Sequence, residues 1–190
     1  MAGRRDELAE AATDYVLEHG LIGLSLRPLA QALGTSDRML LYHFRDKDDL
    51  VATILRTTTE RSVRNLRYLP LAPSLRTAVL DLWRAETAMP QQRCQRLYVE
   101  AAALGLFGRE PYATQVRRAN ADWWEVVTDH FVRAGLAKPA ARRVSKLVDS
   151  AFMGLMLDEP LDSPAQQRRA VQDLADVVEA RWGKAQSGKA

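Results

Sequence analysis

The sequence predicts an all-α protein of about nine helices. Apolar residues recur at helical spacing along most of the 190 residues, and the alternating β-branched runs typical of strands are missing. Prolines and glycines divide the chain into segments of helix length. Because 47% of the residues are hydrophobic, these helices can bury a core.

The first two helices are marked by their ends. A helix is expected over roughly 4–19, because Gly20 and Gly23 follow its apolar stripe. Ser25 is a good N-cap for a second helix, and Gly34 has the residue type that favours the position after a helix.

The third and fourth helices are marked by their caps. Ser36 or Thr35 can cap a short third helix that ends near Phe44. Asp46 can cap a long fourth helix, whose apolar stripe continues to about Leu66 and stops before two prolines.

Five longer helices are expected in the rest of the chain, each bounded by proline or glycine. Their expected ranges are 74–88, 91–107, 112–134, 138–157 and 164–182. Residues 184–190 lack apolar side chains, so we expect a disordered tail there.

The second and third helices form a helix-turn-helix, because two short helices are joined by a tight turn at Gly34. Leu29 faces the third helix, while Met39 or Leu40 faces back together with Phe44. The outer face of the third helix then carries Asp37, Arg38, Leu41 and Tyr42. Arginine reads guanine edges in the major groove, and an aromatic ring can pack on a thymine methyl group or bond a phosphate. The pattern therefore points to double-stranded DNA.

Charge alone does not argue for DNA. The chain carries a formal net charge of +3, but residues 1–50 hold six Lys or Arg against nine Asp or Glu. A net negative segment does not attract phosphate in bulk. The prediction of DNA binding therefore depends on the geometry of the helix-turn-helix.

The stretch "SLRPLAQALGTSDRMLLYHFRDKDDL" at 25–50 resembles the DNA-binding signature of TetR-like repressors. The order of elements and the spacing "LAQALG…YHF..K..L" carry this resemblance. It implies that Ser25, Arg27, Tyr42, His43 and Lys47 lie at the DNA. With the third helix added, the expected DNA-binding residues are Ser25, Arg27, Ser36, Asp37, Arg38, Tyr42, His43 and Lys47.

Two positions depart from the family pattern. Leu41 stands where most members have a phosphate-contacting tyrosine, and Arg38 stands where they often have glycine or proline. We therefore expect Arg38 to read a base that its relatives do not read.

The resemblance also implies an effector cavity in the rest of the chain. Aromatic and methionine side chains of the central helices could line it, although core packing is an alternative for each. The expected ligand-binding residues are Trp83, Tyr98, Phe107, Trp123, Trp124, Met153 and Met156. Glu100, inside an apolar run, either orients a ligand or pairs with Arg93 or Arg96 one turn earlier.

A homodimer is the second implication. The segment 139–158 is apolar on more than one side, and such a helix must be covered on both. Paired with the last helix, it could form a four-helix seam, unless both faces belong to the intrachain core. The expected seam residues are Val148, Phe152, Leu155, Leu174, Val178 and Trp182.

These implications divide the chain. We expect a DNA-binding domain at 1–46, a connecting helix at 47–69, a ligand-binding and dimerisation domain at 70–183 and the tail at 184–190.

Enzymatic functions are not supported. The three histidines lack the spacing of a metal site, Cys94 is the only cysteine, and no phosphate-cradling glycine loop is present. We expect no catalytic residue, no metal and no cofactor. The longest nearly apolar stretch, 97–107, is too short to span a bilayer, so no membrane contact is expected. The single cysteine and the missing leader favour the cytoplasm.

The resulting expectation is a ligand-responsive transcriptional repressor that binds a palindromic operator as a homodimer and is released by a small apolar or aromatic effector. Two alternatives stay open. One is a helical small-molecule-binding or scaffold protein without operator binding, and the other is an activator of the same fold.

Overall fold

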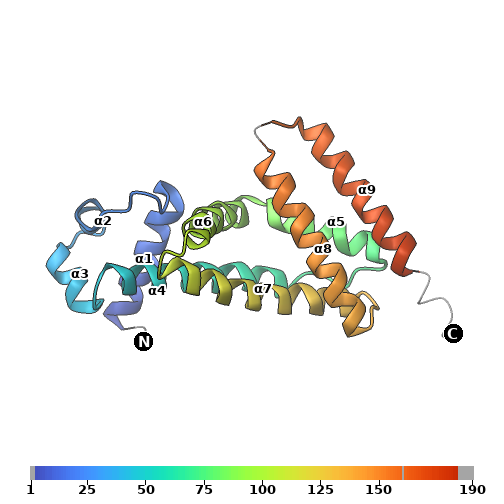
Figure 1. Cartoon of the computed structure of the whole chain (residues 1–190). Coiled ribbons are helices and arrows are strands. Elements are labelled where there is room, and N and C mark those ends of the chain that lie inside the picture. Colours follow the sequence, from blue (N-terminus) through green and yellow to red (C-terminus); the bar gives the residue numbers. More distant parts are fainter. Residues whose placement is uncertain (1–2, 160, 184–190) are drawn as a thin grey trace. The chain divides into compact units, whose positions relative to one another are not determined.

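The computed structural model describes residues 3–159 and 161–183 and confirms the all-α prediction (Figure 1). Within these residues nine helices follow one another. They are α1 (Arg4–His19), α2 (Leu26–Ala32), α3 (Asp37–His43), α4 (Lys47–Arg67), α5 (Leu75–Thr87), α6 (Met89–Leu106), α7 (Tyr112–Arg133), α8 (Lys138–Leu157) and α9 (Pro164–Trp182). The expected tail at 184–190 lies outside the described residues.

Helix ends follow the expected caps. The Ser36 hydroxyl accepts a hydrogen bond from the Met39 N–H at 3.3 Å, and the Asp46 carboxylate accepts one from the Asp49 N–H at 2.8 Å. Helix α6 differs from its expected start, because it begins at Met89 and includes Pro90 in its first turn. Proline is tolerated there, since the first N–H groups of a helix have no partner within it.

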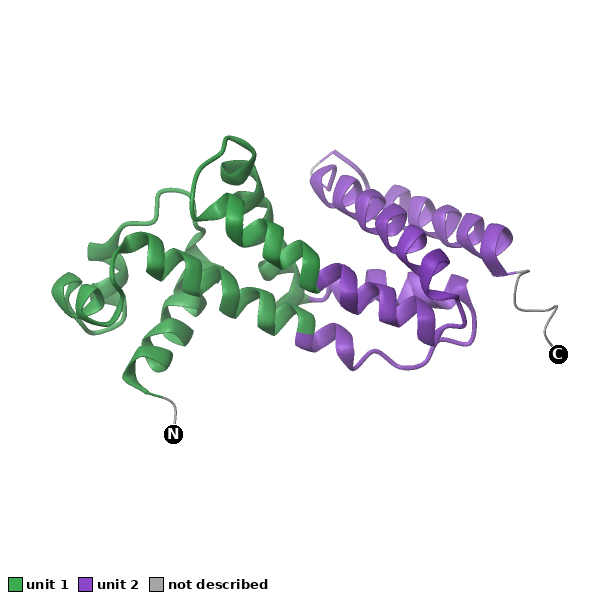
Figure 2. Cartoon of the chain, turned by 60° about the horizontal axis from the view of Figure 1, so that its bottom comes forward, with its two compact units in different colours: residues 1–63, 89–122 green, residues 64–88, 123–190 purple. Residues whose placement is uncertain are grey.

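The chain forms two compact units (Figure 2). Unit 1 contains residues up to 63 together with 89–122, and unit 2 contains 64–88 together with the residues from 123 onward. The division falls inside α4 and α7, so each of these helices contributes to both units. The expected domains at 1–46, 47–69 and 70–183 follow the chain order and stay a prediction.

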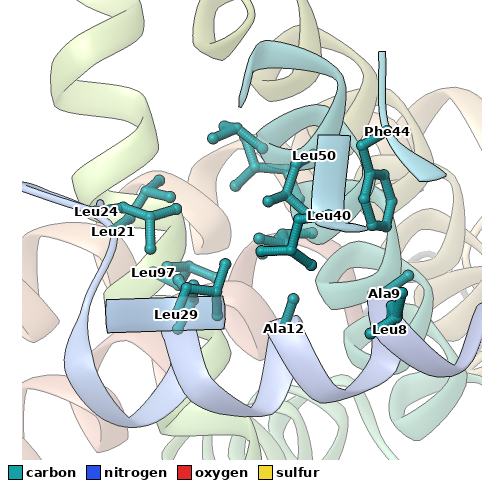
Figure 3. Packing of buried hydrophobic residues seen from close by; sticks show 14 of the residues in the cluster. Leu8, Ala9, Ala12, Leu21, Leu24, Leu29, Leu40, Phe44, Leu50 and Leu97 are labelled. Atoms are coloured by element: carbon teal, nitrogen blue, oxygen red, sulfur yellow. The ribbon is translucent and has the colours of Figure 1, made fainter. Parts of the chain in front are cut away.

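An apolar cluster of unit 1 lies beneath the helix-turn-helix. Leu29 of α2, Leu40 and Phe44 at α3 and Leu50 of α4 are each 0% exposed, and their side chains converge in Figure 3. Leu40, and not Met39, is therefore the residue of α3 that faces inward.

Helix α6 also contributes to this cluster. Leu97 and Ala101 are 2% and 1% exposed and pack among the residues of α1 to α4, and α6 contacts α1. Sequence reasoning had assigned α6 to the other domain, because the apolar face of a helix shows no preference for a partner.

Unit 2 is built on α5, α8 and α9. Helix α9 packs along α5 and against α8 (Figure 1). The Arg76 guanidinium lies 2.6 Å from the Asp176 carboxylate, and the Arg76 N–H donates to Glu179 at 2.9 Å. Trp83 meets Phe152 edge to face with ring centroids 4.9 Å apart. Across the described residues, no helix is both long and apolar enough to cross a membrane.

We expect Leu97→Ala to lower the unfolding free energy by about 2–5 kcal/mol, because it leaves a cavity in the apolar cluster of unit 1. Leu106→Ala on the same helix is the matched control, since Leu106 is 87% exposed, and it should change stability by less than about 0.5 kcal/mol. Denaturant unfolding followed by circular dichroism measures both. Equal effects would mean that α6 does not belong to this core.

Candidate nucleic-acid interface and effector cavity

The outer face of α3 is open to solvent. Tyr42 is 79% exposed and Leu41 43%, and Arg38 is exposed beside them. Leu40 and Phe44 at the same helix are fully buried. Helix α3 therefore presents a side-chain set that includes arginine and tyrosine, the residue types that contact base edges and phosphates.

The tight turn between α2 and α3 depends on Gly34. Its φ is +65°, in the left-handed region that glycine adopts without a steric penalty. The Thr35 N–H then donates to the Ala30 carbonyl at 2.9 Å, and Ser36 caps α3. Ser25 stands at the N-cap of α2 without a side-chain capping bond.

Arg5 of α1 fixes the far end of α3. Its Nε donates to the His43 carbonyl at 3.2 Å, and its Nη2 lies 3.3 Å from the Asp49 carboxylate. The guanidinium also lies 4.9 Å from the centre of the Phe44 ring. Sequence reasoning missed this residue, because 38 positions separate Arg5 from His43 and no local pattern reports such a contact.

Lys47 joins α4 to the segment before α2. Its ammonium donates to the Leu24 carbonyl, while the residue stays exposed. An ammonium has three donors, so this bond positions α4 and leaves capacity for phosphate. The neighbouring His43 is half-buried, and its ring meets that of Tyr42 edge to face at 5.2 Å.

Several acidic residues of the first 50 positions bind cationic side chains or backbone N–H groups within unit 1. Arg61 of α4 binds the carboxylates of Glu10 and Asp14 on α1. Partial burial opposes ionisation of Arg61, but these hydrogen bonds raise its pKa overall. At the start of α4, the Asp49 N–H and then the Arg45 guanidinium lower the pKa of Asp46. Pairs inside the unit therefore offset part of the negative charge of residues 1–50.

A cavity of about 20 Å³ lies within unit 1, bounded by α4, α6 and α7. This volume admits about one water molecule. Its lining residues are Leu55, Thr58, Thr59, Tyr98, Ala101, Gln115, Val116 and Ala119. Both threonine hydroxyls donate to carbonyls of their own helix, and the Tyr98 hydroxyl donates to Asn120 at 2.8 Å. The wall is thus mostly apolar, and besides these hydroxyls its polar side-chain group is the Gln115 carboxamide.

Glu100 has a role that neither expected alternative includes. Its carboxylate accepts hydrogen bonds from the N–H groups of Leu21 and Ile22, both at 2.7 Å. These residues form the turn between α1 and α2, so Glu100 attaches α6 to that turn.

Of the expected ligand-binding residues, Tyr98 lines the cavity in unit 1. Phe107 is 86% exposed, which excludes it from an apolar pocket of the single chain and corrects that prediction. Trp83 packs on Phe152. The Trp124 Nε1 donates to Asp149 at 3.2 Å, and the Lys146 ammonium lies over the Trp124 ring, 4.3 Å from the ring centre.

The remaining three, Trp123, Met153 and Met156, are half-buried in unit 2.

The expected dimer seam divides by burial. Val148, Phe152 and Val178 are 0–1% exposed in the single chain, so they belong to its core, and their assignment to a seam is corrected. Leu155, Leu174 and Trp182 are half-buried. The exposed large apolar residues of these helices are Leu147, Leu157 and Val177.

The described part of unit 2 contains two buried titratable groups. Glu86 of α5 is 4% exposed; burial raises its pKa well above the ordinary value, and the nearby Asp149 carboxylate raises it further. His130 of α7 is 2% exposed, and its Nε2 lies 3.0 Å from the Ala78 carbonyl. Burial lowers the pKa of His130, which keeps the ring neutral.

A buried three-helix scaffold that exposes the outer face of α3 defines a helix-turn-helix protein. Residues 8–54 match the family model of bacterial regulatory proteins, tetR family. The predicted resemblance is confirmed for this segment, and the chain shares its fold with solved structures of TetR-family regulators.

Individual relatives agree with this class. An HTH-type transcriptional repressor of Mycobacterium tuberculosis is 32% identical over 92 residues, which cover 48% of this chain and 45% of that protein. The match thus spans a little under half of the relative.

Solved structures show the same fold over nearly the whole chain. A transcriptional regulator from Rhodococcus sp. Rha1 is 21% identical with a TM-score of 0.75, over 94% of this chain and 97% of that one. The multidrug binding protein EbrR, in complex with imidazole, is 23% identical with a TM-score of 0.67, over 93% and 95% of the two chains.

We expect Arg38→Ala to weaken binding to the best duplex selected from random DNA by about 1–3 kcal/mol and to relax the preference at one base pair in each half-site. Arg143→Ala, an exposed position on α8, removes the same charge and should leave base preference unchanged. Titration against single-base variants of the duplex measures both. A uniform loss on all sequences would make Arg38 a phosphate contact.

Glu86 predicts a pH-dependent stability. Because burial raises its pKa in the folded chain, folding binds a proton, and stability falls as pH rises above the unfolded value of 4.5. We expect Glu86→Gln to be more stable than the parent at pH 8, with a difference that shrinks toward pH 4. Denaturant unfolding across this range measures it, and exposed Glu125→Gln is the control. A pH-independent difference would contradict the assignment.

Proposed function

We propose that this chain is a homodimeric, ligand-responsive transcriptional repressor of the cytoplasm that binds a palindromic DNA operator. The observation that carries the proposal is the outer face of α3. It exposes Arg38 and Tyr42 on a helix whose other side is fully buried, within the segment that matches the tetR family model.

DNA contact is assigned to the residues around this face. Arg38 and Tyr42 lie on α3, with Asp37 and the Ser36 cap at its start. Arg27 and Ser25 are exposed at the start of α2, and Lys47 is exposed at the start of α4. In a helix-turn-helix complex these positions face the major groove and the flanking phosphates.

The cavity of unit 1 supports an effector of apolar or aromatic character. Leu55 and Val116 supply apolar surface, and Tyr98 supplies a ring with one hydroxyl. The structurally similar EbrR binds imidazole, which is a small aromatic ring. At about 20 Å³ the cavity is smaller than any such effector, so binding requires its walls to move apart.

Helices α8 and α9 are the proposed dimer seam. Leu147 of α8 and Val177 of α9 are 42% and 56% exposed, and half-buried Leu155 and Leu174 flank them. A two-fold dimer has a self-complementary interface and places two recognition helices on the two halves of a palindrome. A single seven-residue helix does not bind DNA tightly enough to occupy an operator.

The proposed mechanism is a shift between two forms. Effector binding moves the walls that α4 and α6 supply, and this changes the separation of the two α3 helices from about 34 Å, one DNA turn. The effector acts only through its higher affinity for the form that does not fit the operator.

Selection of duplexes from random DNA tests the function. We expect the wild-type chain to enrich a palindrome, with affinity that falls steeply as salt rises. A screen of small aromatic compounds for release of that duplex then tests the effector. No enrichment above that of a non-binding control protein would refute operator binding and favour a small-molecule-binding or scaffold role.

We expect Val177→Glu to give a monomer that has lost tight operator binding and keeps its helical circular dichroism, since Val177 is exposed in the single chain. Gln172→Glu, on the other side of α9, is the control and should stay dimeric. Sedimentation measures both. A dimeric Val177→Glu with normal DNA binding would place the seam elsewhere.

A further inference from the structure

The turn between α1 and α2 is held by a carboxylate from a distant helix. Glu100 of α6 lies 79 residues after Leu21, and one of its oxygens accepts the N–H groups of both Leu21 and Ile22 at 2.7 Å. Hydrogen bonds to an ionised acceptor are stronger than those between neutral groups. The turn that leads into the helix-turn-helix is therefore fastened to α6.

Gly20 makes this approach possible. A Cβ on Gly20 would lie 3.2 Å from a Glu100 oxygen, and the φ of Gly20 is +87°. Both the close carboxylate and the left-handed backbone favour glycine here. The turn is thus shaped around the carboxylate.

The same stretch of α6 borders the cavity. Tyr98 and Ala101, on either side of Glu100 in sequence, line it, and Ala101 also packs in the apolar cluster with Leu97. One helical turn of α6 therefore touches the cavity, the core beneath α3 and the α1–α2 turn. Displacement of this turn by an occupant would move the carboxylate with it.

We propose that Glu100 is a positioning residue that couples occupancy of the unit 1 cavity to the orientation of the helix-turn-helix, by carrying movements of α6 to the N–H groups of Leu21 and Ile22. This rests on the proposed function. Glu100 is not among the residues that line the cavity, and it acts through the turn that it holds.

The test uses an overfilled cavity as a built-in occupant. Ala119 lines the cavity from α7. The phenylalanine side chain of Ala119→Phe, the filler variant, is larger than the cavity of about 20 Å³, so the cavity walls must separate. The filler is combined with Glu100→Gln, which keeps size but loses charge, and with Glu100→Ala, which removes the acceptor. Ala119→Leu serves where the larger filler does not fold, and exposed Glu125→Gln and Glu125→Ala are the matched controls.

The first readout is affinity for the selected duplex. We expect Ala119→Phe to weaken binding by about 10-fold or more with Glu100 present, within the usual range of allosteric coupling. With Glu100→Ala the filler should weaken binding by less than about 3-fold, and with Glu100→Gln by an intermediate factor. A merely structural Glu100 would lower stability without changing the effect of the filler, and equal filler effects in all three backgrounds would overturn the proposal.

The second readout does not need DNA. Amide hydrogen exchange of Leu21 and Ile22 should accelerate in Glu100→Ala and in Ala119→Phe, while the amide of Leu29, buried in the same unit, keeps its protection. Unchanged exchange of Leu21 and Ile22 in the filler variant overturns the coupling. Absence of any duplex binding by the wild-type chain refutes the proposed function instead, so the two failures are distinguishable.

Discussion

A seven-residue helix such as α3 is not stable alone in water, because the nucleation of a helix costs more than its few hydrogen bonds return. Its position therefore depends on the burial of Leu40 and Phe44, which are 0% exposed. That burial also fixes which side of α3 faces outward, since a helix has only one side opposite its apolar stripe. The whole exposed set around Arg38 follows from these two side chains.

Electrostatic contacts add a second constraint to the same helix. Arg5 contacts the carbonyl at its end and the Asp49 carboxylate on α4, while Arg61 gathers Glu10 and Asp14. Pairs this exposed contribute little stability each. Their larger effect is on charge, because acidic residues that pair within the unit do not repel phosphate from α3.

Helix α6 connects the interior of unit 1 to its outer face. It supplies Leu97 to the core beneath α3, Tyr98 to the cavity wall and Glu100 to the α1–α2 turn. A close-packed interior transmits small displacements between such neighbours. A cavity as small as the one in unit 1 cannot accept an organic molecule without such displacements. Because α6 forms part of the cavity wall, an occupant would displace α6.

Local spacing determined much of this protein. Caps at Ser36 and Asp46, the turn at Gly34 and the 3.6-residue stripes placed all the described helices and the outer face of α3, because these features depend on residues within a few positions of one another. The family signature at 25–50 lies within the same local range. Only the tertiary structure decided that Leu97 lies under α3, that Glu100 binds Leu21 and that Val148 is core while Phe107 is exposed. An apolar stripe states that a helix face must be covered, but it does not state which distant helix covers it.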